Sequence, residues 1–107
     1  GTGTGVAPFR SFYQTYPGLN CKIIHGVRYE TETYDSGDYA DGLYVPCVSK
    51  PSNGVARRVT DYLFTDDTIS ADTIFYLCGN RKMIVDVFEL LRSRGFGGDS
   101  LRTEVFF

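Results

Sequence analysis

The segment 74–91 reads IFYLCGNRKMIVDVFELL and places an apolar run, a glycine turn and an amphipathic pattern in direct succession. The run Ile74–Cys78 is short and rich in aromatic and aliphatic residues, which predicts a buried strand. From Met83 to Leu91, apolar residues recur at the spacing of one helix face, and a glycine-rich stretch at 95–98 ends the pattern. A strand that passes through a turn into a helix is the repeating unit of parallel α/β sheets.

The remainder of the chain repeats this alternation. Residues 29–41 are ambiguous and are interpreted as a short helix with a loop, and Pro46 inside a strand indicates a sheet edge or an irregularity. No hairpin signature interrupts the pattern. The sequence therefore predicts an α/β fold, a three-layer, Rossmann-like, doubly wound parallel sheet with helices on both faces. Its further helices are expected over 8–16 and 57–64, and its further strands over 21–27, 43–48 and 102–107.

Composition and charge narrow the functional classes. The 107 residues suffice for one domain, and the formal net charge of −2 lacks the positive field that nucleic-acid binding requires. No apolar run is long enough to cross a bilayer, so we expect no membrane insertion. Cys21, Cys47 and Cys78 lack the spacing of a zinc knuckle or a redox CxxC pair, which argues against a metal site and indicates a reducing, cytoplasmic compartment.

The first residues, Gly1-Thr2-Gly3-Thr4-Gly5, form a glycine-rich start without methionine, which we interpret as the sign of a fragment of a longer polypeptide. Small residues let backbone N–H groups approach a phosphate closely, and a helix beginning at Pro8 would add its positive N-terminus. The dinucleotide fingerprint GxGxxG is incomplete, because Val6 stands at the third glycine position. A terminal remnant without function is the alternative interpretation.

Basic residues follow the ends of the first two predicted strands. Arg28 follows the strand 21–27, in a region where NAD-binding folds usually carry an acid for the ribose 2′-hydroxyl. His25, inside that strand, is interpreted as a packing residue. Because parallel strand ends open on one sheet edge, a phosphate there would meet several cations, and ordinary solvated basic residues are the alternative. The strand 43–48 is followed by a second polar cluster, Ser49, Lys50, Arg57 and Arg58.

Cys78 and Gly79 end the strand in the segment quoted first. Strand ends of this kind face the ligand crevice in open α/β sheets. Glycine leaves room for a flat ring, and a thiol can lie against such a ring without bonding to it. A simple connection from strand to helix with a buried cysteine is the alternative.

Taken in order, these segments resemble the NADP(H)-binding domain of the ferredoxin–NADP reductase family. The resemblance spans the whole chain, and the ordered set is more specific than any one motif. The matching segments are the pyrophosphate loop and its helix at Gly3–Phe12, His25–Arg28, Val48-Ser49-Lys50 against Val-Ser-Arg, Cys78–Met83 against Cys-Gly-x-x-x-Met, and the acidic and aromatic end Glu104–Phe107.

The resemblance implies hydride transfer from NADPH to FAD, followed by electron delivery to ferredoxin, flavodoxin or another carrier. Glu104 would belong to a proton or hydrogen-bond path near the flavin, and Phe107 would cover the flavin. Cys78 would border the nicotinamide, beside Gly79 and Met83. The same resemblance assigns the pyrophosphate to Gly3, Thr4 and Gly5, with Val6 and Pro8 in the same loop, and the 2′-phosphate to Arg28, Ser49, Lys50 and Arg58.

Two departures from the family pattern matter. Lysine replaces arginine at Lys50, which loses a bidentate fork. The FAD-binding barrel and the strand leading into the glycine loop are not in the sequence. We therefore expect the FAD-binding domain elsewhere in the same polypeptide, and expect the 107-residue chain alone neither to catalyse nor to fold stably as a monomer. Two other functions stay open. One is a non-catalytic NADP(H)-binding regulatory or assembly module, and the other is an NADH-dependent reductase component of an oxygenase, against which Arg28 and Arg58 argue.

Overall fold

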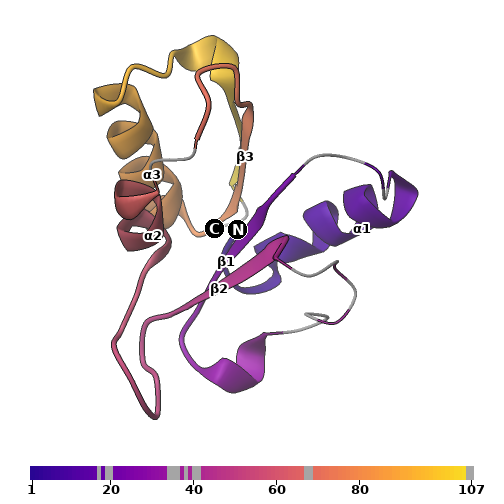
Figure 1. The fold of residues 1–107 in the computed structure, drawn as a ribbon, viewed down its shortest axis with the longest axis vertical. Coiled ribbons are helices and arrows are strands. Elements are labelled where there is room, and N and C mark those ends of the chain that lie inside the picture. The colour runs from indigo at the N-terminus through magenta and orange to yellow at the C-terminus, as the bar shows by residue number, and fades with distance from the viewer. Residues whose placement is uncertain are drawn as a thin grey trace.

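The computed structural model describes residues 1–16, 18, 21–33, 37, 39, 42–66 and 69–105, with the backbone alone at 4, 5, 104 and 105. Strands and helices alternate along the chain (Figure 1). In chain order the elements are η1 (Gly3–Val6), α1 (Ala7–Thr15), β1 (Ile23–Val27), η2 (Glu30–Glu32), β2 (Tyr44–Val48), α2 (Val59–Thr65), β3 (Phe75–Gly79), α3 (Arg81–Ser93), η4 (Gly98–Ser100) and β4 (Leu101–Val105), where η marks a 3-10 turn.

The described strands form two parallel pairs. β1 pairs with β2 from Ile23 opposite Tyr44 to Val27 opposite Val48. β3 pairs with β4 from Phe75 opposite Leu101 to Gly79 opposite Val105. β2 has β1 as its single neighbour among the described strands, so the edge position expected from Pro46 is confirmed.

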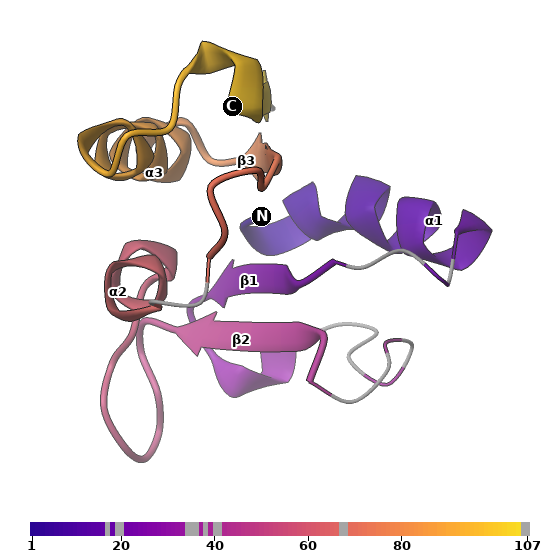
Figure 2. The ribbon, with the colours of Figure 1, turned by 45° about the horizontal axis from the view of Figure 1, so that its top comes forward.

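Gly1 and Thr2 lie between these pairs and join them. The Gly1 nitrogen donates to the Ile24 oxygen at 2.9 Å, and the Gly26 N–H donates to the Gly1 oxygen at 2.8 Å. On the other side, the Thr2 N–H donates to the Cys78 oxygen at 3.3 Å. Both ribbon views place the N-terminus between β1 and β3 (Figures 1 and 2). The order β2, β1, Gly1–Thr2, β3, β4 matches the 3-2-1-4-5 order of a doubly wound sheet, with two residues at the central position.

Helices cover both faces of this arrangement, so the predicted three-layer α/β fold is confirmed. Alternate residues of β1 face opposite sides. Ile23 packs with Val6 and aromatic residues on the side of α1. Ile24 packs against the cluster formed by β2, β3, β4, α2 and α3, in which Val87 and Leu91 are fully buried. In Figure 1, α1 lies on one side of the strands and the α2/α3 pair on the other.

The predicted elements are found with small shifts in their bounds. The Asn80 side chain accepts from the Lys82 N–H at 2.8 Å and the Met83 N–H at 3.3 Å, which starts α3 earlier than its apolar pattern. α2 begins two residues later than predicted, because Asp61 accepts from the Arg58 N–H at 2.8 Å and makes Arg58 its N-cap. Of the ambiguous region 29–41, the described residues contain the turn η2, and most of the remainder lies outside them.

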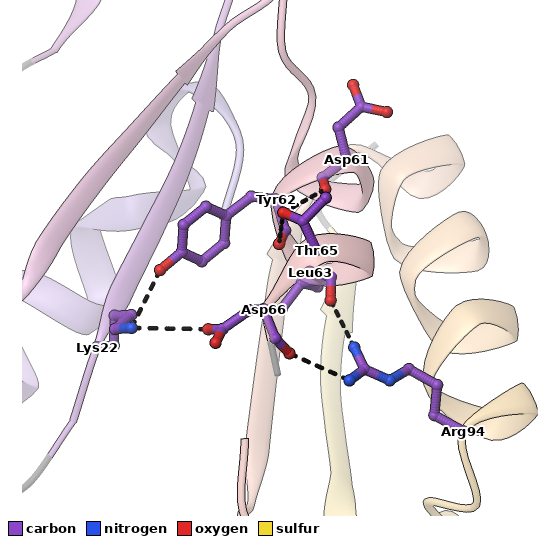
Figure 3. A network of polar contacts seen from close by, with 7 residues as sticks. All are labelled: Lys22, Asp61, Tyr62, Leu63, Thr65, Asp66 and Arg94. Atoms are coloured by element: carbon purple, nitrogen blue, oxygen red, sulfur yellow. Dashed lines mark hydrogen bonds and ion pairs between the residues drawn. The ribbon is translucent and has the colours of Figure 1, made fainter. Parts of the chain in front are cut away.

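A polar network ties together the amino end of β1 and the carboxyl ends of α2 and α3 (Figure 3). Lys22 Nζ donates to the Tyr62 hydroxyl at 3.0 Å and lies 3.6 Å from Asp66 Oδ2. The Arg94 guanidinium donates to the Leu63 oxygen and, at 3.1 Å, to the Asp66 oxygen. Since these carbonyls end α2, one cation caps that helix from the neighbouring one.

Within the residues described, no helix combines the length and the apolar character that crossing a membrane requires.

Candidate functional site

A cavity of about 450 Å³ opens at the carboxyl ends of β1, β2 and β3. This is where open α/β sheets bind their ligands. The residues lining it that the sequence had singled out as ligand-binding are Gly3, Arg28, Ser49, Arg58 and Met83. Arg57, which belongs to the polar cluster after the second predicted strand, lines it as well. Among the lining residues to which the sequence assigned no binding role are Thr2, Gly26, Glu32, Lys82 and Asp86.

The cations of this cavity differ in what they contact. The side chains of Arg28 and Arg58 are exposed and make no hydrogen bond or ion pair within the described part of the chain. Arg57 instead donates from Nη2 to the Pro46 oxygen at 2.9 Å and lies 5.3 Å from the centre of the Tyr62 ring. Lys82 pairs with Asp86 at 3.1 Å. Two guanidinium groups at the cavity are therefore available to an anion, while the other two cations already have partners.

The pairing of β1 with β2 continues beyond the strand ends. The Ser49 N–H donates to the Val27 oxygen at 2.9 Å, and the Lys50 N–H donates to the Arg28 oxygen at 2.8 Å. This pairing brings Arg28 next to Ser49, as the sequence predicted. The exposed Lys50 side chain is not among the residues that line the cavity.

Two glutamates hold the segments around the cavity. Glu30 Oε1 accepts from the N–H of Ser52 at 2.9 Å and from its hydroxyl at 3.3 Å, and we call this contact the Glu30–Ser52 clasp. The backbone N–H groups of Glu30 and Ser52 lower the pKa of the Glu30 carboxyl. Glu32 Oε1 accepts from the Tyr29 N–H at 2.9 Å and lines the cavity. The sequence interpretation missed this acid because it considered the strand end alone, four residues earlier.

The glycine-rich loop contributes its backbone. Gly3 lines the cavity with φ at 51°, a conformation that favours glycine, and Thr4 and Gly5 continue the turn η1. Helix α1 has no side-chain cap at its N-terminus and carries proline in its first turn, at Pro8. Val6 is 6% exposed and packs in the core below the loop, so its side chain supports the loop from the interior.

Cys78 and Gly79 lie behind the cavity wall. Cys78 is 2% exposed, and neither residue is among those lining the cavity. Gly79 has φ at 124°, and a Cβ there would meet Thr2 Oγ1 far inside van der Waals contact. The same hydroxyl accepts from the Asn80 N–H at 2.8 Å. The space beside Gly79 is filled by Thr2, which is a packing reason for glycine that the sequence interpretation did not consider.

Two predicted residues lie at the end of the chain. Glu104 is opposite Cys78 in the β3–β4 register, and its side chain lies outside the described residues. Phe107 lies outside them altogether.

A doubly wound parallel sheet with a cationic cavity at its carboxyl edge defines the class of nucleotide-binding α/β domains. Residues 1–89 match the family model described as oxidoreductase NAD-binding domain, and the chain belongs to this family. The resemblance to the NAD(P)-binding domain of ferredoxin–NADP reductase-type proteins is thereby confirmed, and membership of this family supports pyridine-nucleotide binding.

A solved structure supports the same fold. The cytochrome P450 reductase GcoB from Amycolatopsis matches with a TM-score of 0.78 and 24% sequence identity. The match covers 99% of this chain and 36% of that chain, so the chain spans about a third of that reductase. A search of curated proteins gives no match.

Proposed function

We propose that this chain is the NADP(H)-binding domain of a flavin-dependent oxidoreductase. The observation that carries the proposal is the pair of guanidinium groups, Arg28 and Arg58, which face one cavity without a partner among the described residues. A phosphate monoester is the ligand group that such a pair fits, because guanidinium forks form charge-assisted hydrogen bonds with phosphate oxygens.

The lining of the cavity suggests how the nucleotide would lie. Arg28, Ser49 and Arg58 would hold the 2′-phosphate, and the backbone of the loop Gly3–Gly5 would hold the pyrophosphate. The nicotinamide would then lie toward Met83, with Cys78 and Gly79 behind it. Lys50 follows Ser49 directly, and its exposed side chain would add a third cation near the 2′-phosphate.

In the proposed reaction, NADPH supplies a hydride to FAD. This chain would hold and orient the nucleotide, while the flavin would be bound mainly by an FAD-binding domain of the same polypeptide. Glu104 and Phe107 would lie toward the flavin. The electrons would pass to ferredoxin, flavodoxin or a similar carrier, in a cytoplasm that keeps the three free cysteines reduced.

Titration of the whole protein with NADP⁺ and NAD⁺ tests the proposal. Charge-assisted contacts to the 2′-phosphate contribute about 1.5–3 kcal/mol each, so NADP⁺ should bind at least tenfold more tightly at low salt. Raising the salt concentration should narrow the gap, because exposed charges are screened. Equal affinities at every salt concentration would contradict the proposal.

A second candidate is an NADH-dependent reductase, and Glu32 favours it. Its carboxylate lines the same cavity as Arg28, and an acid near this position binds the ribose 2′-hydroxyl in NAD-dependent folds. Glu32→Gln distinguishes the two functions. The substitution should weaken NAD⁺ binding if the carboxylate holds the ribose, and should strengthen NADP⁺ binding if the carboxylate only repels a phosphate.

The proposed position of Cys78 behind the nicotinamide can be tested separately, in the flavin-containing protein. If Cys78 lies behind the nicotinamide, Cys78→Ala should slow hydride transfer with little change in NADP⁺ affinity. A variant with lower stability and a normal transfer rate would assign Cys78 to packing alone.

A further inference from the structure

His25 is a buried polar residue with a defined pair of contacts. It lies in the middle of β1, is 0% exposed, and uses both ring nitrogens. Nε2 is 2.7 Å from the Gly3 oxygen, and Nδ1 is 2.7 Å from the Tyr44 hydroxyl. The imidazole therefore links two adjacent strands to the glycine-rich loop.

These contacts fix where the imidazole carries its proton. A carbonyl oxygen can only accept, so Nε2 must hold the proton that is donated to Gly3. Burial lowers the pKa of His25, partly opposed by the Gly3 carbonyl, which favours the neutral ring. Nδ1 is then an acceptor for the Tyr44 hydroxyl, whose pKa burial raises to about 12. The Nε2–H tautomer follows from the donors and acceptors alone.

The aromatic neighbours hold this arrangement in place. The ring of Tyr44 stacks on that of Tyr39 with centroids 5.4 Å apart and an angle of 11°. Tyr39 in turn lies 5.2 Å from the ring of Tyr13 on helix α1. Because each ring restricts the next, the hydroxyl that faces His25 has a fixed direction.

The contact between His25 Nε2 and the Gly3 oxygen, which we call the His25 tether, sets the orientation of the glycine-rich loop. The Gly3 carbonyl is drawn into the interior, although Gly3 itself lines the cavity. The peptide bond between Gly3 and Thr4 is trans, so its N–H points in the direction opposite to that carbonyl. A loop held in this way turns the Thr4 N–H away from the His25 ring and withdraws an oxygen that would repel an anion.

We propose that His25 is a positioning residue for a diphosphate, whose imidazole holds the Gly3 carbonyl inward so that the glycine-rich loop presents N–H groups to the diphosphate of a dinucleotide. This inference rests on the proposed function, since it assigns the loop to the diphosphate. It changes the interpretation of His25 from a packing residue to a residue that acts on the ligand through the loop.

Two substitutions at His25 separate the tether from general packing. His25→Gln keeps an N–H donor near the position of Nε2, whereas His25→Asn reaches only the position of Nδ1 and releases Gly3. In the whole protein, each variant is titrated with NADP⁺, which contains the diphosphate, and with adenosine 2′-monophosphate, which lacks it. His25→Asn should weaken NADP⁺ binding about tenfold and leave adenosine 2′-monophosphate within about twofold, as expected for one lost polar interaction. His25→Gln should restore most of the NADP⁺ affinity.

The outcomes distinguish this inference from the function on which it rests. Equal weakening of both ligands by His25→Asn, or no weakening of either, would overturn the inference and leave the proposed function intact. If the wild-type protein binds neither NADP⁺ nor NAD⁺, the proposed function fails and the inference with it. If a variant does not fold, the inference can still be tested on the wild-type protein. The ¹⁵N chemical shifts of the imidazole should show the Nε2–H tautomer, and an Nδ1–H tautomer would overturn the inference.

Discussion

The two ends of β1, α2 and α3 use their charges in opposite ways. At the amino end of β1, Lys22, Asp66 and Arg94 are bound to one another or to helix-ending carbonyls (Figure 3). At the carboxyl end, Arg28 and Arg58 have no partner among the described residues and line a cavity. The same elements thus have one end at which these charges are paired and one end at which two of the four cations lining the cavity, Arg28 and Arg58, have no partner among the described residues. This contrast predicts which substitutions affect stability and which affect binding.

Gly79→Ala tests whether the carboxyl edge also contains residues that stability requires, because Gly79 lies at that edge and is required by packing. A Cβ would collide with Thr2, and alanine is strained at a φ of 124°. We expect a loss of about 2–4 kcal/mol in the free energy of unfolding. Denaturant titration measures it, with Gly97→Ala as control, since a Cβ at Gly97 has no atom within 4 Å. Equal stability of the two variants would contradict the packing role of Thr2.

The double substitution Arg28→Ala and Arg58→Ala tests whether the unpartnered arginines of the carboxyl edge affect binding and not stability. Removing two charge-assisted contacts should weaken NADP⁺ binding by about 100-fold, while stability changes by less than about 0.5 kcal/mol. Isothermal titration and thermal unfolding measure the two quantities. Arg92→Ala serves as the control. Arg92 lies in the last turn of α3 and does not line the cavity, so this variant should bind NADP⁺ normally. A large loss of stability in the double variant would mean that these arginines have structural partners.

Arg94→Ala is the reciprocal test at the amino edge. The guanidinium donates to two carbonyl oxygens that end α2, so its loss should lower the free energy of unfolding by about 1–2 kcal/mol. NADP⁺ affinity should stay unchanged. Arg94→Lys should recover part of the stability, because one ammonium retains the charge without the fork. Weaker NADP⁺ binding by a folded Arg94→Ala protein would show that the two ends are coupled.

Lys22→Met should have the smallest effect. The ion pair with Asp66 has a separation of 3.6 Å, and the Lys22 side chain is 40% exposed. Pairs of this kind contribute less than about 1 kcal/mol and are screened by salt. Denaturation at low and high salt should therefore give a small difference that shrinks with salt. A salt-independent loss would assign the effect to the contacts of Lys22 Nζ with Tyr62, whose hydroxyl accepts from it and whose ring centre lies 5.6 Å away.

Local sequence patterns predicted the elements well, because hydrophobic period and glycine placement act over a few residues. The buried face of α3, formed by Ile84, Val87 and Leu91, follows directly from helical spacing. The edge position of β2 follows from Pro46, which cannot donate to a neighbour. Arg28 and Ser49 could be placed together because parallel strand ends share one edge of a sheet.

The missed parts of the site depend on contacts between distant segments. The contact of Thr2 with Asn80 joins residues 78 positions apart, and it explains Gly79 in a way that no local pattern could. The family resemblance selected Arg58 over its neighbour Arg57, and a reason that no local pattern contains is that Arg57 is anchored to Pro46 and Tyr62. Lys50 matched a family motif, but its side chain does not line the cavity. Which cation faces a ligand is decided by tertiary packing.

The Glu30–Ser52 clasp has a consequence for the entropy of binding. It joins the segment that follows Arg28 to the loop that precedes Arg58, so it restricts the relative movement of these two segments before a ligand arrives. Two independent loops would have to lose their conformational freedom at the moment of binding, and that loss would reduce the affinity. With the clasp formed, this ordering is completed during folding. If Arg28 and Arg58 bind one phosphate as proposed, this preorganisation would raise their affinity for it.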